Sequence, residues 1–372
     1  MNFRLNAQSL TATAALALTF AAAWPVHAQT TVATAAPTAA AGSPADDNAA
    51  VRRVLVLGKI RGHLLASITD WDMSQYDLAM HHAAEIPTEL YSIVSSDLKS
   101  AGLQDSFLKA ANTYAQLSMQ AGDKTAVHAA YDGLIAVIQQ ASDAFAPTAD
   151  FADPIFRLKV AQGLLNGVAE EYGEGVSAGK LVKPIGYQNA VGFLQIAEEQ
   201  YTAARNTLPA IFAAQFPDLD KTVSAQYAML AAAMPSSLIV PAALPDAQTL
   251  QQSIDAIRQA EEQALSVSIV TNRSVPEIIA AARVGLNDAL AAFTAGTDNA
   301  YDLSASAYLD NYEGLEVALR AKNATLTDLI ESQFNQFNEL IKSGGTLDDL
   351  KALDAQLSAN LDQAQTILTA TP

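Results

Sequence analysis

Histidine and carboxylate side chains are concentrated in one short stretch of the sequence. His63, His81 and His82 fall within 20 residues, and Glu85 and Glu89 follow them. His82 and Glu85 are three residues apart, so they share one face of a helix. Imidazole and carboxylate groups are suitable ligands for iron, zinc or copper. If a helical hairpin brings His63 back beside the others, the stretch predicts a metal site that these five residues form.

A purely structural role for the same side chains stays open. Histidines near a helix end can take nearby carboxylates as hydrogen-bond partners without any metal. Pro87 stands between Glu85 and Glu89, and a proline alters the helical geometry at that point. His128 is isolated among alanines, so we expect it to be a packed or surface residue of a helix.

Glu313 and Glu316 are a second candidate for metal binding. Carboxylates three residues apart on a helix can converge on one hard cation. Glu316 falls at the edge of an apolar stripe that includes Tyr312, whereas Glu313 is expected closer to solvent. The alternative is an ordinary surface ion pair between Glu316 and Arg320, four residues later.

The elements that must position these groups are helices. From about residue 46 the apolar residues recur at spacings of three and four, which indicates amphipathic helices. Gly296, Asn323 and Gly344 are expected to end helices. Helices are predicted at about 46–68, 87–101, 104–120, 124–145, 154–178, 186–207, 217–234, 246–270, 276–295, 298–322, 325–343 and 346–368.

The predicted fold is all-α, with antiparallel helical bundles in two helical domains. Residues 46–234 form the first domain and residues 246–372 the second. Between them, the polar and proline-bearing segment 235–245 is predicted to be a linker. Short connections between the later helices favour antiparallel packing.

The N-terminus predicts export. Residues 1–28 contain Arg4, an apolar run over 14–23 and the ending Val26-His27-Ala28, which is typical of a secretory signal peptide. Residues 29–45 are rich in Ala, Thr and Pro and predict a disordered leader. We therefore expect a periplasmic protein. No later membrane span is expected, because prolines interrupt the least charged stretch, 222–245.

Composition excludes several classes of function. A formal net charge of −18 disfavours nucleic acid and anionic membranes, but it attracts cations and basic partners. The absence of cysteine excludes disulfides, thiolate metal sites and cysteine nucleophiles. There is no Gly-x-Ser-x-Gly motif, no phosphate-binding loop and no pair of Glu-x-x-His motifs. We therefore expect no enzymatic activity.

Two stretches carry a resemblance to a known family. They are residues 169–193, with Glu170-Glu171-Tyr172-Gly173 and Tyr187-Gln188-Asn189, and residues 281–316. They resemble the periplasmic helical region of bacterial EfeU/Ftr-type iron permeases, without the membrane domain. The family's membrane motif is Arg-Glu-Gly-Leu-Glu, and here Tyr312 stands in place of its arginine before Glu313. The resemblance implies a role beside iron uptake, and transport activity is not carried over.

A second resemblance is shorter. His82-Ala83-Ala84-Glu85 is similar to the second half of the Gly-x-His-x-x-Glu pattern of imelysin-like periplasmic iron proteins, with Met80 at the glycine position. It favours iron over zinc or copper.

Together these features predict a periplasmic metal-binding accessory protein that handles iron. Its partners would be a metal cation and an envelope iron-uptake protein. A non-catalytic helical scaffold of the cell envelope is the alternative.

Overall fold

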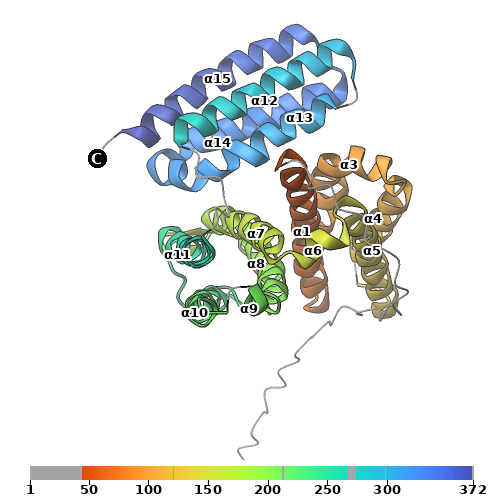
Figure 1. Cartoon of the computed structure of the whole chain (residues 1–372). Coiled ribbons are helices and arrows are strands. Elements are labelled where there is room, and N and C mark those ends of the chain that lie inside the picture. Colours follow the sequence, from red (N-terminus) through yellow and green to blue (C-terminus); the bar gives the residue numbers. More distant parts are fainter. Residues whose placement is uncertain (1–43, 120, 212, 267–273, 298, 371–372) are drawn as a thin grey trace, which may run out of the picture. The chain divides into compact units, whose positions relative to one another are not determined.

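The structure is a computed structural model of the whole chain, and it describes residues 44–119, 121–211, 213–266, 274–297 and 299–370. The predicted signal peptide, and the predicted leader up to residue 43, lie outside this range. Helices dominate the described residues (Figure 1), where the strands are the two-residue pair β1 (Val176–Ser177) and β2 (Lys180–Leu181). The all-α prediction is confirmed.

The N-terminal helices pack around one hydrophobic cluster. α1 (Pro44–Asp72) and α2 (Tyr76–Glu85) are joined by a three-residue turn at 73–75. α1 continues four residues past its predicted end because Trp71, in its last turn, is buried in the cluster. α2 is not among the predicted helices. The cluster is completed by α3 (Tyr91–Ser100), α4 (Gln104–Ser118) and α5 (Lys124–Phe145).

Pro87 does not begin a helix, which corrects the prediction. It lies in the π-helical turn η1 (Ile86–Leu90), which connects α2 directly to α3. Proline has no N–H group to donate to the carbonyl four residues earlier, so it breaks the α-helical ladder. The wider π-helical turn continues the backbone hydrogen bonding past the proline, because the N–H of Tyr91 donates to the carbonyl of Ile86, five residues back.

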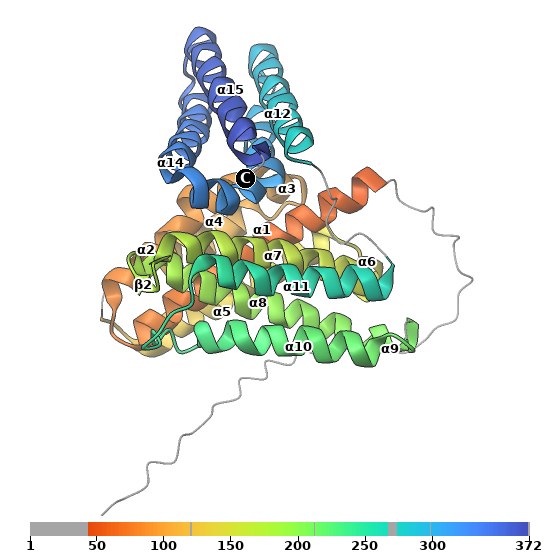
Figure 2. The same cartoon turned by 90° about the vertical axis from the view of Figure 1, so that its left-hand side faces the viewer.

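Four longer helices share a second hydrophobic cluster. They are α7 (Pro154–Gly175), α8 (Pro184–Arg205), α10 (Phe216–Ala233) and α11 (Ala247–Leu265), with the short α6 (Thr148–Ala152) and α9 (Leu208–Ile211) beside them. α10 and α11 lie side by side (Figure 2). The predicted linker, 235–245, is non-helical, yet α11 beyond it joins the same core as α7 and α8. The predicted division into two domains stays a prediction.

A close crossing of α1 and α8 places the first helix against this cluster. A Cβ atom at Gly192 would collide with the carbonyl of Gly62, and a Cβ atom at Gly62 would meet the ring of Phe193. Only glycine permits the two backbones to touch in this way. The crossing holds His63, the residue after Gly62, against α8, where its ring meets the ring of Phe193 edge to face at 5.2 Å.

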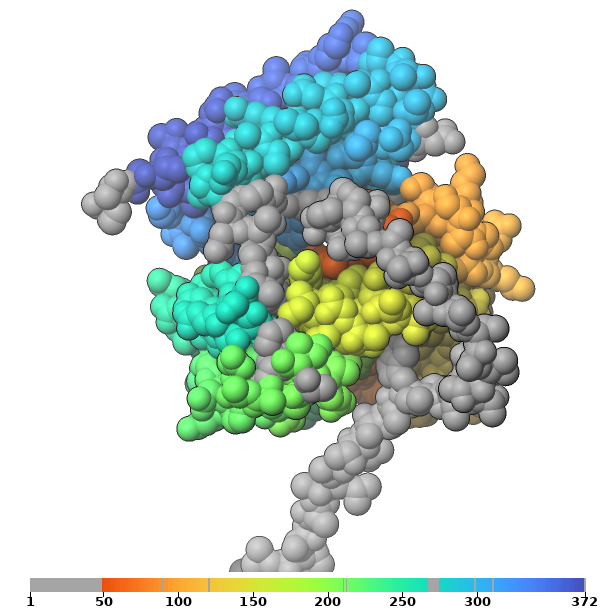
Figure 3. Space-filling view, viewed as in Figure 1, coloured from red at the N-terminus to blue at the C-terminus, as the bar shows by residue number. Residues whose placement is uncertain are grey.

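The C-terminal helices have a core of their own. They are α12 (Val275–Ala295), α13 (Ala300–Ala307), the π-helical turn η2 (Tyr308–Tyr312), α14 (Glu313–Ser343) and α15 (Leu347–Thr369). They pack as closely fitted helices, cyan to blue in Figure 3.

The helix boundaries in this region follow most of the sequence signals. Gly296 and Gly344 end α12 and α14 with positive φ angles of 67° and 70°, as predicted. Asn323 is non-helical, with φ −158° and ψ 81°, and separates two helical segments within α14, so the predicted helix end is confirmed; its side chain caps the second segment by accepting the N–H of Leu326. The predicted helix 298–322 is interrupted by η2.

One helix of the described part, α12, is long and apolar enough to cross a membrane by length and composition alone. The sequence argument considered residues 222–245 and missed it. Ile279, Leu286 and Ala289 of α12 lie in the core of the C-terminal bundle, and Arg283 forms an ion pair with Asp362 on α15. These are features of a packed bundle helix, and the absence of a membrane span stays a prediction.

Candidate metal centre

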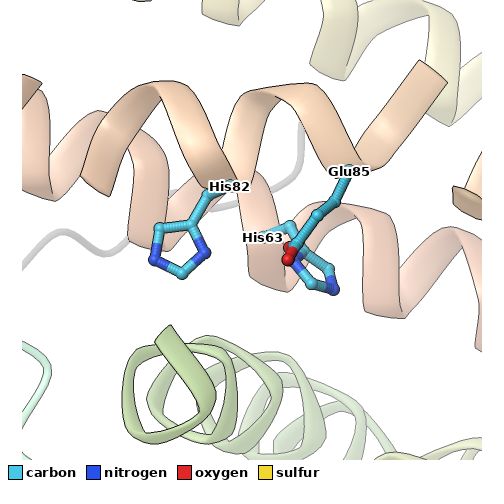
Figure 4. Close-up of side chains that lie close together, drawn as sticks. All are labelled: His63, His82 and Glu85. Carbon is cyan, nitrogen blue, oxygen red and sulfur yellow. The ribbon is translucent and has the colours of Figure 1, made fainter. Parts of the chain in front are cut away.

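Three of the predicted ligands converge between α1 and α2. His63, His82 and Glu85 each offer a ligand atom, and these atoms all lie within 4.8 Å of one another (Figure 4). The turn at 73–75 brings His63 back beside α2, and a buried hydrogen bond from Ser67 Oγ to the carbonyl of Ala79 ties the two helices together. We call these three residues the histidine centre.

The histidine centre is largely buried, and three of its polar atoms have no hydrogen bond among the described residues. His63 is 5% exposed and His82 is fully buried. His63 Nδ1 lies 2.7 Å from Glu85 Oε2, but neither atom makes a hydrogen bond of acceptable geometry within the described residues, and neither does His82 Nδ1. Buried polar atoms normally have a hydrogen-bond partner. Two imidazole nitrogens and one carboxylate oxygen without hydrogen bonds are suited to bind a cation.

A hydrogen-bonded chain orients His82. Gln188 on α8 donates its amide hydrogen to Asp70 Oδ1 at 2.8 Å, so its amide oxygen faces His82 Nε2 at 3.0 Å. Since that oxygen can only accept, Nε2 must carry the hydrogen, and the lone pair stays on Nδ1. Metal-binding histidines are typically held by such a contact through the other ring nitrogen.

Burial sets the protonation of this chain. It lowers the pKa of His82 to about 4, with the nearby His63 acting in the same direction, so the imidazole is neutral at pH 7. It also raises the pKa of Asp70 to about 7, although the hydrogen bond from Gln188 opposes that change. A neutral imidazole is the form that binds metals.

Glu85 is the anionic member of the histidine centre. Burial by itself would raise its pKa, but contact with His63 and the charges of His63, His82 and His81 outweigh that effect and lower it. Two imidazoles and one carboxylate form the ligand set of many non-haem Fe(II) sites and of some zinc sites.

Of the other two predicted ligands of this stretch, His81 does not join the centre. His81 lies at the rim, with a 57% exposed side chain whose Nδ1 is 3.2 Å from Glu85 Oε1. Glu89 falls in η1, and its side chain is not among those described. His128 is a surface residue that forms an ion pair with Asp72 at 3.0 Å, as its isolation in the sequence suggested.

Glu313 and Glu316 belong to a separate group on α14. Glu313 is not near solvent as predicted, because Lys59 of α1 pairs with it and leaves its side chain 12% exposed. Glu316 is 1% exposed. The proposed surface pair with Arg320 is also wrong, since Arg320 reaches across to Glu174, Asp328 and Glu331.

The sequence argument missed the residues that surround the ligands. It assigned no role to Lys59, Glu170, Glu171, Gln188 or Asn189, although the last four occur in the stretch that carries the family resemblance. One signal was available. Asn189, Phe193 and Ile196 have helical spacings of four and three, so a polar residue occupies the apolar stripe and must have a buried partner, which is Glu171 at 3.2 Å.

Comparison with known families identifies one region of the chain. Residues 147–268 match the iron permease-associated 4-helix bundle domain. The matched span contains α7, α8, α10 and α11 and the core they share. This region is therefore a helical region of the Ftr-type iron permease family, and it links the chain to iron permeases and iron uptake. No curated protein and no solved structure matches the chain.

The matched bundle and the histidine centre are in direct contact. Gln188 and Phe193 come from α8, inside the matched span, whereas the three candidate ligands come from α1 and α2, outside it. The bundle thus supplies the groups that orient the ligands, and the helices before it supply the ligands.

Proposed function

We propose that this protein is a periplasmic accessory protein of iron uptake that binds one transition-metal cation, ferrous iron, at His63, His82 and Glu85. The observation that carries the proposal is the convergence of one ligand atom each from His63, His82 and Glu85 within 4.8 Å. In the same group, His63 Nδ1, His82 Nδ1 and Glu85 Oε2 are buried and make no hydrogen bond among the described residues. The family match of residues 147–268 supports iron, and the predicted signal peptide supports the periplasm.

The ligand set suits a protein that receives and releases a metal. Three protein ligands leave coordination positions for water, unlike the closed four-ligand sites that hold structural zinc. Asp70 and Gln188 would keep His82 in the binding tautomer while the cation exchanges. We propose binding rather than catalysis, with an envelope iron-uptake protein as the partner.

Metal titration of the chelator-treated mature protein tests the proposal. Calorimetry and native mass spectrometry with Fe(II) under anaerobic conditions, and separately with Zn(II) and Cu(II), should detect one bound cation at the histidine centre. His63→Ala and His82→Ala should each weaken that binding strongly, since each removes one of the three protein ligands. His128→Ala is the control, and it should bind like the wild type because the contacts of His128 are with Asp72 and Trp71, not with the three ligands.

Two results would overturn the proposal. If the wild type binds none of the three metals, the scaffold interpretation replaces it. If His82→Ala binds as tightly as the wild type, the cation is held elsewhere. Binding of zinc without any binding of Fe(II) would remove the assignment to iron.

A further inference from the structure

One side of α2 carries three side chains of metal-binding types in succession. Asp77, His81 and Glu85 are each four residues apart, so they follow one another along the same side of the helix. Asp77 and His81 are exposed, whereas Glu85, the last residue of α2, is partly buried. We call these three residues the α2 track. It ends at a residue that also belongs to the histidine centre.

Glu85 connects the α2 track to the histidine centre, because its two carboxylate oxygens face different histidines. Oε2 lies 2.7 Å from Nδ1 of the buried His63 (Figure 4). Oε1 lies 3.2 Å from Nδ1 of the exposed His81. A carboxylate can bind a metal ion through one oxygen or through both. One side chain therefore lies between a surface imidazole and a buried imidazole.

Glu85 is also the most exposed of the three candidate ligands. Its side chain is 16% exposed, against 6% for His63 and 0% for His82. On the inner side, the ring of Phe193 packs against His63, and Gln188 contacts His82. Among the three ligands, the one that a hydrated cation meets first is therefore Glu85.

His81 and His82 are adjacent in sequence but face different sides of α2. Consecutive residues of a helix point about 100° apart around its axis. The side chain of His82 is fully buried, whereas that of His81 is 57% exposed. His81 is not one of the residues whose ligand atoms converge within 4.8 Å. It can thus contact a cation in solvent, but it does not complete the buried centre.

We propose that His81 is the entry ligand of the histidine centre: His81 and Glu85 capture the hydrated cation at the surface, and Glu85 then passes it to His63 and His82. This inference rests on the proposed metal binding at the histidine centre and adds the route to it. Moving a charge out of water is costly unless protein ligands replace the water. His81 supplies one such ligand at the surface, and Asp77 adds negative charge that attracts cations.

An entry ligand changes the rates of binding and release but not the affinity. Both steps pass the same residue, so its removal slows them by the same factor and leaves the dissociation constant, which is their ratio, unchanged. A residue that only supports the fold of the centre has a different effect, because a loosened site releases its cation faster. A kinetic measurement therefore distinguishes the two roles of His81.

Stopped-flow mixing of the mature protein with Co(II), followed by displacement with a chelator, tests the proposal. A site of nitrogen and oxygen ligands that holds Fe(II) holds Co(II) at least as tightly, and the visible absorption of Co(II) reports the change of ligands. His81→Ala should slow both association and dissociation by at least about tenfold, with a dissociation constant within about threefold of the wild-type value. Asp77→Asn should slow association by only about two- to threefold, since it removes attraction and not a ligand.

Two further variants serve as controls. His128→Ala removes another exposed histidine, one that pairs with Asp72, and should take up Co(II) at the wild-type rate. His81→Glu keeps a metal-binding side chain at the entry, so it should restore association to within about threefold of the wild-type rate.

The outcomes separate the entry role from the histidine centre itself. If the wild type takes up no Co(II), both proposals fail. If the wild type binds Co(II) but His81→Ala takes it up equally fast, the entry role is refuted and the centre stands. Faster dissociation from His81→Ala would also refute the entry role, because it indicates structural support. Association of His81→Glu as slow as that of His81→Ala would refute the role of His81 as a ligand.

Discussion

The histidine centre and the ion pair between Lys59 of α1 and Glu313 of α14 are both largely buried, yet the fold keeps these two groups buried in opposite ways. At the histidine centre, burial lowers the pKa of His82, so its imidazole is neutral at pH 7. The hydrogen bond with Gln188 fixes the orientation of the ring. At the ion pair, the charge of Lys59 remains, because Glu313 and Glu170 outweigh burial and raise its pKa, whereas burial raises the pKa of the neighbouring Glu316 to about 8.

The pKa of Glu171, on α7, responds to both groups, through the charge of Glu85 at the histidine centre and that of Lys59 at the ion pair. Burial raises its pKa to about 8 although Asn189 donates a hydrogen bond to it, and the charges of Glu174 and Glu85 add to that rise.

The largest expected effect is the difference between Glu85 and Glu313 in transition-metal binding. Glu85→Ala should weaken Fe(II) or Zn(II) binding by more than about 100-fold, because it removes a ligand and not merely an orienting group. Glu313→Ala should leave that affinity close to the wild-type value, since Glu313 contacts Lys59 and not the histidines. Calorimetric titration of both variants measures this difference. Equal losses would show that the two groups act as one site.

The metal-free protein should lose stability in opposite pH directions at the two groups. His82 has a pKa of about 4 when folded and 6.5 when unfolded, so its contribution is complete above pH 6.5 and is lost as the pH falls toward 4. That loss is on the order of 2–3 kcal/mol. Glu316 has a pKa of about 8 when folded and 4.5 when unfolded, so its contribution is complete below pH 4.5 and is lost as the pH rises through 8.

Urea unfolding at pH 4.5, 6.5 and 8.5 checks both signs. His82→Gln, which is neutral throughout, should flatten the change between pH 6.5 and 4.5 without altering the alkaline side. Glu316→Gln should flatten the change between pH 6.5 and 8.5. Unaltered slopes in both variants would contradict this account of how the two groups are buried.

A smaller effect is expected from the residue that orients His82. Gln188→Leu should weaken transition-metal binding by about 10- to 100-fold, because the tautomer of His82 is no longer fixed. Gln200→Leu is the matched control on the same helix; Gln200 is also buried, but its partner is Arg157. Affinities from calorimetry should separate the two variants. The same loss in both would mean that packing of α8, rather than the hydrogen bond, matters.

The smallest effect is expected at the rim of the histidine centre. His81→Ala removes an exposed ion pair with Glu85 and should change the free energy of unfolding by less than about 1 kcal/mol. Metal affinity should fall by less than about tenfold. A loss as large as that of His82→Ala would make His81 a ligand, and it would extend the centre to the surface.

The sequence by itself determined the helical class, most helix ends and two of the candidate ligands. Helical periodicity is local, and Gly296 and Gly344 end helices because glycine accepts a positive φ angle, so both signals can be read without tertiary information. His82 and Glu85 could be paired because their spacing places them on one helix face. Pro87 misled the prediction, since the sequence does not distinguish a helix start from a π-helical turn.

Only the tertiary structure decided which groups meet across helices. His63 reaches α2 through the turn at 73–75, and the Gly62–Gly192 crossing sets its distance from α8. Lys59 and Glu313 are 254 residues apart in sequence, so no local pattern could pair them. Burial, which raises or lowers each pKa, depends on those same long-range contacts. The local sequence therefore predicts which side chains are candidates, and the packing of the helices determines their partners and the direction in which each pKa shifts.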